Sequence, residues 1–186
     1  MSACTQILVA LRNADPTALT ALGCLRDSLG FGALLGTVHR RVLWELQGPA
    51  GEETEELLAV LRRTGELFNP NKEVAHIRRE GEGVASLGSP TPGEEGWESY
   101  LAWNPRRDLE RLPPGLTGFR RRGWHLARGV LWSLRWTGGS AQERLRWGQE
   151  AVLCVGPRQG LLVHPHLEDH RRVVDTDLPP WLPEPG

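Results

Sequence analysis

Short apolar runs alternate with amphipathic stretches along the first half of the chain. The run Ile7–Leu11 predicts a strand that is buried on both faces. Asp15 and Pro16 then mark the start of a helix, because an Asp side chain can accept hydrogen bonds from the first amides and proline is favoured at the first helical position. Gly30 ends this helix. Its apolar face carries four leucines, Leu19, Leu22, Leu25 and Leu29.

Four more elements follow in this half: the strands Leu35–Val38 and Val42–Leu46, a helix from near Gly51, and the strand Glu73–Arg79. Acidic residues crowd the start of the helix and Arg62 and Arg63 lie at its end, as the helix dipole favours. Its buried stripe is Leu57, Leu58 and Leu61. A turn at Asn69 and Pro70 precedes the last strand. The order βαββαβ predicts an α+β, ferredoxin-like domain, with two helices on one face of a four-stranded antiparallel sheet.

Two landmarks of this half recur in the second half. Arg41–Leu46 (RVLWEL) returns as Gly129–Leu134 (GVLWSL), and Leu67–Glu73 (LFNPNKE) returns as Leu162–Glu168 (LVHPHLE). Both recur in the same order at an offset of roughly 90 residues, which is typical of a tandem duplication. We therefore expect two ferredoxin-like domains of one type that form a pseudo-dimer within the chain.

The duplication sets the domain boundaries. We expect a first domain at 1–80, a linker at 81–96 that is rich in Gly, Ser, Pro and Glu, a diverged second domain at 97–174, and a proline-rich tail at 175–186. Trp181 either anchors the tail or belongs to an unpacked end.

The second domain carries its own helix signals. Asn104-Pro105 repeats the start of the first helix, and Pro113-Pro114-Gly115 stops it early. Ser140 and Glu143 form a capping box for the second helix, which Gly156-Pro157 would end.

These motifs together resemble PurS, the small subunit of phosphoribosylformylglycinamidine synthase. In that family the first helix begins at L-D-P-Q-G and the domain closes with L-L-A-N-P-V-I-E-D-Y, which Leu161–His170 (LLVHPHLEDH) follows closely. The positions that match the family are Asp15, Pro16, Asn69, Pro70 and Glu73 in the first half, and Gly129, Pro165, Glu168 and Asp169 in the second.

The resemblance implies a protein that is not catalytic on its own. It would bridge the glutaminase and synthetase components of the amidotransferase of purine synthesis and would carry no cofactor, because the ATP and glutamine chemistry belongs to those partners. The chain itself has no Walker loop, no G-x-G-x-x-G after a strand, no H-E-x-x-H and no nucleophile elbow. We expect a monomer or a dimer.

The chain departs from the family at one motif. Where the family has V-R-V-G-K, the first half keeps only Val38 and the second keeps only Gly129. The duplication and this loss together favour a changed role as an alternative, either a repurposed binding module or a pair of domains that senses a small molecule.

The repurposed module would bind single-stranded nucleic acid. Arginines interleaved with aromatic residues can neutralise phosphates and stack on bases. The candidates are Arg120, Arg121, Arg122, Trp136, Arg144, Arg146 and Trp147. The competing interpretation makes the tryptophans core or interface residues and the arginines solvated edges. Trp44 and Trp132 share a repeat position and fit that second interpretation.

A metal site is the weakest of the candidates. His164, His166 and His170 lie beside Glu168 and Asp169, and alternation along a strand would place the three histidines and Glu168 on one face. The aligned positions of the first half do not repeat the histidines, so we expect no metal.

We expect a cytoplasmic protein. The 186 residues have a net charge of -1, with the basic excess in the second half. The first residues show neither a signal peptide nor a membrane anchor. The three cysteines, Cys4, Cys24 and Cys154, follow no C-x-x-C spacing, which fits reduced thiols.

Overall fold

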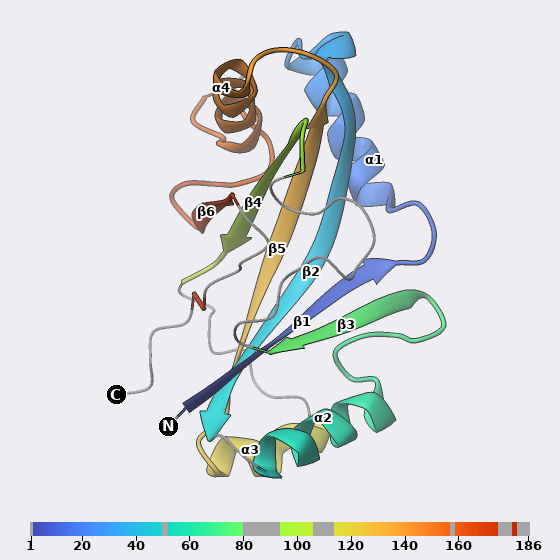
Figure 1. Cartoon of the computed structure of the whole chain (residues 1–186), viewed down its shortest axis with the longest axis vertical. Coiled ribbons are helices and arrows are strands. Elements are labelled where there is room, and N and C mark those ends of the chain that lie inside the picture. The colour runs from blue at the N-terminus through green and yellow to red at the C-terminus, as the bar shows by residue number, and fades with distance from the viewer. Residues whose placement is uncertain are drawn as a thin grey trace.

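One antiparallel sheet organises the computed structural model, which describes residues 2–49, 52–79, 94–105, 114–156, 159–174 and 180–181. Its six strands have the order β3-β1-β2-β5-β4-β6 (Figure 1). The strands are β1 Ser2–Leu11, β2 Leu35–Pro49, β3 Glu73–Arg79, β4 Trp97–Trp103, β5 His125–Trp136 and β6 Asp169–Val173. The α-helices are α1 Pro16–Gly23, α2 Glu52–Thr64, α3 Thr117–Arg121 and α4 Ala141–Val152. The α+β class is confirmed.

The prediction of two strands at Leu35–Val38 and Val42–Leu46 is wrong, because both belong to the single strand β2. The residues between them, His39, Arg40 and Arg41, include no glycine, proline or asparagine that would favour a turn. They pair with Ser133, Trp132 and Leu131 of β5. Each half therefore contributes three strands to one six-stranded sheet, where the sequence predicted a four-stranded sheet in each half.

The helices divide between the two ends of the sheet (Figure 1). At one end α1 and α4 cover a buried cluster that includes Leu25, Trp132 and Trp136. At the other end α2 and α3 cover a second cluster, which includes Leu46 and Leu126. Side chains alternate along a strand, so the even-numbered residues 126, 132 and 136 of β5 share one face. Both pairs of helices therefore lie on the same face of the sheet.

A third buried cluster lies on the opposite face. Its members are Leu8, Leu43, Leu101, Ala127, Leu131, Val173 and Trp181. Trp181 lies beyond the last strand and is 7% exposed, so it anchors the described part of the tail. The rest of the tail, 175–179 and 182–186, lies outside the described residues, as does most of the expected linker.

The helix signals of the sequence are mostly confirmed. Asp15 accepts hydrogen bonds from the amides of Thr17 (2.8 Å) and Ala18 (3.4 Å), with Pro16 as the first helical residue. A π-helix, Cys24–Ser28, continues α1. The capping box of Ser140 and Glu143 is formed. All three leucines of the α2 stripe, Leu57, Leu58 and Leu61, are fully buried.

Two helix boundaries differ from the predictions. Helix α4 ends at Val152, ahead of Gly156, because the chain there turns into an isolated bridge between Leu153 and Val163. The helix expected after Asn104-Pro105 falls on residues 106–113, outside the described part of the chain, and the helix α3 begins only after Gly115. Among the described helices, none has both the length and the apolar character needed to cross a membrane.

Candidate functional site

The first candidate is a hollow beside the early part of β2. Strand β1 pairs with β2 only between Ser2↔Pro49 and Val9↔Val42, so residues 35–41 of β2 extend past it. The hollow occupies this space, between the end of β1, the start of α1 and β2, and has a volume of about 360 Å³. It is lined by Ala10, Leu11, Asn13, Ala14, Asp15, Ala18, Leu19, Thr37, Val38, His39, Arg40 and Arg41. It therefore joins the family-motif residue Asp15 to the residues that replace V-R-V-G-K.

Asp15 and Arg40, two charged residues that line this hollow, make contacts within the fold. One carboxylate oxygen of Asp15 caps α1, and the other lies 3.3 Å from Nη1 of Arg40. The Arg40 guanidinium also lies over the ring of Trp132, 5.9 Å from its centroid. Asp15 thus connects the start of α1 to the middle of β2, and both of its oxygens are occupied.

The side chains of Arg41 and His39 lie on the face of β2 opposite that of Arg40, because side chains alternate along a strand. Arg41 is 4% exposed, and burial lowers the pKa of its guanidinium. The imidazole of His39 meets the ring of Trp97 edge-on at 5.3 Å. Burial, and then the charge of Arg41, lower the pKa of His39 below its ordinary 6.5. Both effects favour a neutral imidazole in the folded protein.

This environment predicts a pH effect at His39. Well above the ordinary pKa of 6.5 the imidazole is neutral in both states, whereas on acidification the unfolded state takes up the proton first, so the folded state loses stability. We expect the free energy of unfolding of the natural chain, relative to that of His39→Gln, to be constant well above pH 6.5 and to fall as the pH drops through 6.5. Urea unfolding across this pH range measures the difference. A difference that does not change with pH would contradict the prediction.

The closing motifs of the two halves adopt the same turn. In the first, the carboxylate of Glu73 accepts a hydrogen bond from the amide of Asn69 (2.5 Å), and the amide of Glu73 donates to the carbonyl of Asn69 (2.7 Å). In the second, Glu168 and His164 make the same two bonds, both at 2.9 Å. Each turn leads directly into an edge strand of the sheet, β3 or β6.

Gly129 has a packing role. A Cβ atom at this position would lie 2.9 Å from Cδ1 of Leu101 and 3.1 Å from the carbonyl oxygen of Ala102. The glycine therefore allows β4 and its side chains to approach β5 closely. Asp169 begins β6 opposite Trp103 and is exposed.

The tryptophans proposed for nucleic-acid stacking are packed against other rings. Trp136 is 3% exposed and lies 5.5 Å from the ring centroids of both Phe31 and Trp147. Trp147 is partly buried against the same cluster. Trp136 has no free face for a base, which agrees with the core interpretation of these residues.

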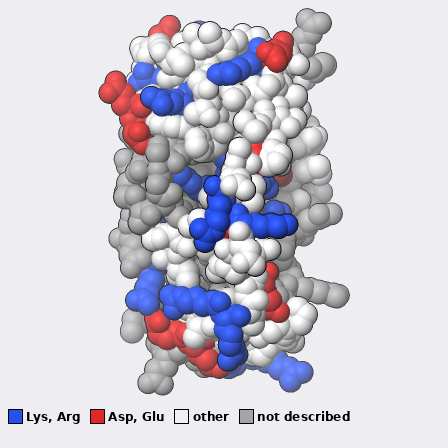
Figure 2. All heavy atoms as spheres, turned by 90° about the vertical axis from the view of Figure 1, so that its right-hand side faces the viewer, with Lys and Arg blue, Asp and Glu red and all other residues white. Residues whose placement is uncertain are grey.

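Most of the arginines proposed with them have local partners. Arg122 pairs with Glu56 at 2.7 Å and lies over the ring of Phe119. Arg144 donates to the carbonyl of Gly139, and Arg146 lies 3.7 Å from Glu150. Arg121 is exposed, and the side chain of Arg120 lies outside the described residues. On the side of the molecule seen in Figure 2, basic residues gather in its middle and lower parts, next to acidic ones.

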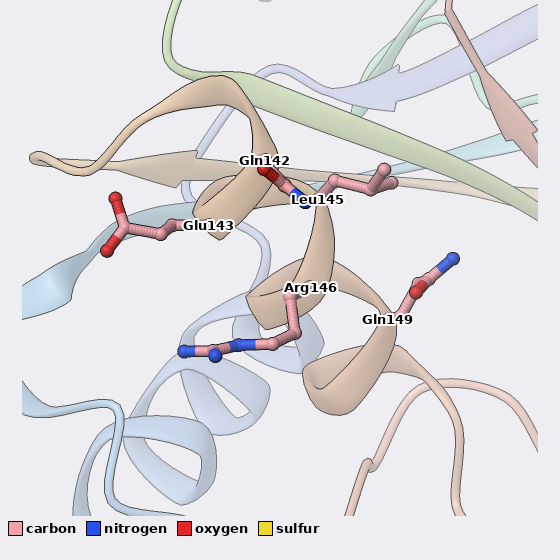
Figure 3. A pocket seen from close by; sticks show the side chains of 5 residues that line it. All are labelled: Gln142, Glu143, Leu145, Arg146 and Gln149. Atoms are coloured by element: carbon pink, nitrogen blue, oxygen red, sulfur yellow. The ribbon is translucent and has the colours of Figure 1, made fainter.

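A hollow of about 500 Å³ follows the exposed surface of α4, which carries two of these arginines. Its lining residues are Gln142, Glu143, Leu145, Arg146 and Gln149 (Figure 3). All five come from one helix, and Figure 3 shows their side chains pointing in different directions. The carboxylate of Glu143 is held by the amide and the hydroxyl of Ser140, which lowers its pKa. The residues do not converge on a common point, so this surface forms no site.

A third hollow, of about 440 Å³, lies between α1 and the second half of the chain. It is lined by Pro16, Thr17, Thr20, Ala21, Cys24, Trp132, Leu161 and Leu162. The hydroxyl of Thr20 donates to the carbonyl of Pro16. The lining includes no charged side chain that could orient a ligand.

The three histidines do not share the face of a strand. Residues 164–168 form a turn, and β6 begins only at Asp169. The rings of His164 and His166 lie 5.7 Å apart, but the Glu168 carboxylate bonds to the amide of His164. Within the ranges that the structure describes, no group of three or more His, Cys, Asp or Glu side chains is arranged to hold a metal.

Sequence reasoning missed a buried polar network on the face opposite the helices. The carboxylate of Glu45, which is 0% exposed, accepts hydrogen bonds from the side-chain amides of Gln6 and Gln47, both at 2.9 Å. The amide of Trp181 donates to both of its oxygens, at 3.2 and 3.1 Å. One signal was visible, because Glu45 interrupts an otherwise apolar run in β2.

Comparisons of the chain with family models, with curated proteins and with solved structures found no match.

Proposed function

We propose that the chain is a tandem duplication of a PurS-like unit and acts as a non-catalytic, protein-binding subunit. The observation that carries the proposal is the register of β2 and β5. Val42 and Val130, which hold the same place in the repeated segment, pair with each other, while Arg41 pairs with Leu131 and Leu43 with Gly129. This is the pairing expected of two equivalent strands around a local two-fold axis.

The rest of the sheet supports the same relation. The strand order reads β3-β1-β2 inward from one edge and β6-β4-β5 inward from the other. Val9 pairs with Val42, and Ala102 pairs with Val130. The first and second strands of each half are therefore joined at corresponding positions, and the shared closing turn adds a third correspondence.

The duplication favours a role in assembly. PurS subunits pair through their sheets, and a fused pair satisfies that contact within one chain along the β2–β5 ladder. The charged groups of the hollow beside β2 are held by helix capping and ion pairing. By the resemblance, the partners are the glutaminase and synthetase components, between which this protein would assist ammonia transfer.

A reconstituted amidotransferase tests this role. The purified chain is added to glutaminase and synthetase components that lack their small subunit, and amidation of formylglycinamide ribonucleotide is measured with glutamine or with ammonium as the nitrogen source. We expect the chain to raise the glutamine-dependent rate and to leave the ammonium-dependent rate unchanged. A single-domain PurS serves as the positive control. No rise with glutamine would reject the bridging role, and the duplication would then be judged by the turn variants below.

The duplication predicts equal effects at the two closing turns. Glu73→Ala and Glu168→Ala each remove a charge-assisted hydrogen bond to the amide four residues earlier. We expect each to lower the free energy of unfolding by about 1 kcal/mol, and the double variant by about the sum, since the turns enter opposite edges of the sheet. Denaturant unfolding of the three variants measures this. A loss confined to one of the two turns would contradict their equivalence.

A further inference from the structure

The sheet face opposite the helices holds a pocket for an indole ring. Trp181 reaches this face from beyond β6 and packs with Leu8, Leu43 and Leu131. Its ring lies 6.4 Å from that of Trp103. The ring also lies against Gly129, where an added Cβ atom would be 3.5 Å from Cζ2 of Trp181, an ordinary van der Waals contact.

The sheet also provides an acceptor for the main chain of the segment that carries this ring. Glu45 receives the amide of Trp181 on both carboxylate oxygens. Gln6 and Gln47 hold the same carboxylate from within the sheet, and Arg78 donates to the side-chain oxygen of Gln6 at 2.5 Å. These residues belong to β1, β2 and β3, so three strands of the sheet contribute side chains to the position of the acceptor.

Extended peptides are recognised through hydrogen bonds to their main chain together with pockets for their side chains. We propose that this face is a docking site for a proline-flanked, tryptophan-bearing peptide segment, which the chain's own Trp181 occupies in cis. The sequence around Trp181 is Leu-Pro-Pro-Trp-Leu-Pro. Proline has no amide to donate and favours an extended backbone, so the amide of the tryptophan reaches Glu45 without competition from the proline before it.

The site can be opened after the protein has folded. A protease site is placed in the tail after Val174, the folded chain is cleaved, and a fluorescent peptide with the sequence of residues 176–186 is added. We expect saturable binding to the cleaved protein and at least about a hundredfold weaker binding to the uncleaved one, because the tethered tail competes at a high effective concentration. Fluorescence anisotropy measures both.

Two variants test the chemistry of the contact. The same peptide with alanine in place of tryptophan is expected to bind about tenfold more weakly or worse, since a buried indole is a typical anchor of an interface. Glu45→Gln in the protein, which keeps the shape of the side chain and removes its charge, is expected to weaken binding as well. The cleaved Glu150→Ala protein is the matched control and should bind the peptide as the natural sequence does.

The proposal fails under any of three outcomes. Cleavage could unfold the protein or leave a tail that does not exchange, and Trp181 would then be an ordinary core residue. The tail could leave without the peptide binding in its place. The peptide could bind equally well without its tryptophan. Circular dichroism and mass spectrometry of the cleaved protein distinguish the first outcome from the other two.

Discussion

Replacing Glu45 with alanine is expected to lower the free energy of unfolding by about 3 kcal/mol. The carboxylate is fully buried and accepts from Gln6, Gln47 and the amide of Trp181. Its removal leaves these buried donors without their acceptor, in surroundings where water cannot replace it. Urea unfolding followed by circular dichroism measures the loss.

A matched control separates burial from charge. Glu150→Ala also removes one carboxylate, but this side chain is exposed on α4 and its contact with Arg146 is long, at 3.7 Å. We expect little change in stability, because exposed ion pairs contribute little. Equal losses in the two variants would mean that the Glu45 network does not stabilise the fold.

The Glu45 network could not be predicted from the sequence, whereas the local features of the fold could. The turns and helix starts were predictable, since Asp15, Ser140 and the turn at Asn69 act within a few residues of chain. Glu45 is satisfied by groups that lie 39 and 136 residues away in the chain. A single acidic residue in an apolar strand indicates that a partner exists, but only the register of β1 against β2 identifies it.

The continuity of strand β2 also depends on contacts that are distant in the sequence. Three consecutive polar residues separate two apolar runs, and the runs predicted two strands, although Arg40 and Arg41 were compatible with an extended chain. Their polarity is accounted for by tertiary contacts, since Arg40 pairs with Asp15 and Arg41 is buried. The pairing of β2 with β5 then joins the two halves of the chain edge to edge into one sheet.

Some candidate residues could be placed from the sequence and others could not, because only some of them depend on local structure. Most of the family-motif residues lie at turns and caps, where local sequence determines structure, and the structure brings Asp15 beside Arg40 of the altered motif. The stacking role of Trp136 depended on its exposure, and the sequence does not distinguish a tryptophan on the outer face of a strand from one beneath α4. Its packing against Phe31, more than 100 residues earlier, is a property of the whole fold.

Gly48→Ala is expected to destabilise the protein by about 3 kcal/mol. The new Cβ atom would lie 2.2 Å from Cδ2 of Trp124, and 2.6 Å from two further ring atoms. Trp124 is 1% exposed and is packed with Leu116 and Phe119, so its ring cannot move aside without disturbing the cluster under α2 and α3. Urea unfolding measures the loss, and a shift in tryptophan emission would report the displaced ring.

Gly118→Ala is the matched control for that substitution. Gly118 lies in α3, and a Cβ atom there meets nothing within 4 Å, so alanine should stabilise the protein by about 0.5 kcal/mol through its higher helix propensity. Combining Gly48→Ala with Trp124→Leu, which removes the ring, should cost less than the sum of the two single losses, because the clash occurs only when both the methyl group and the ring are present. Simple additivity would show that Gly48 and Trp124 are not in contact, and β2 would then have to pass this end of the sheet at a greater distance from α3.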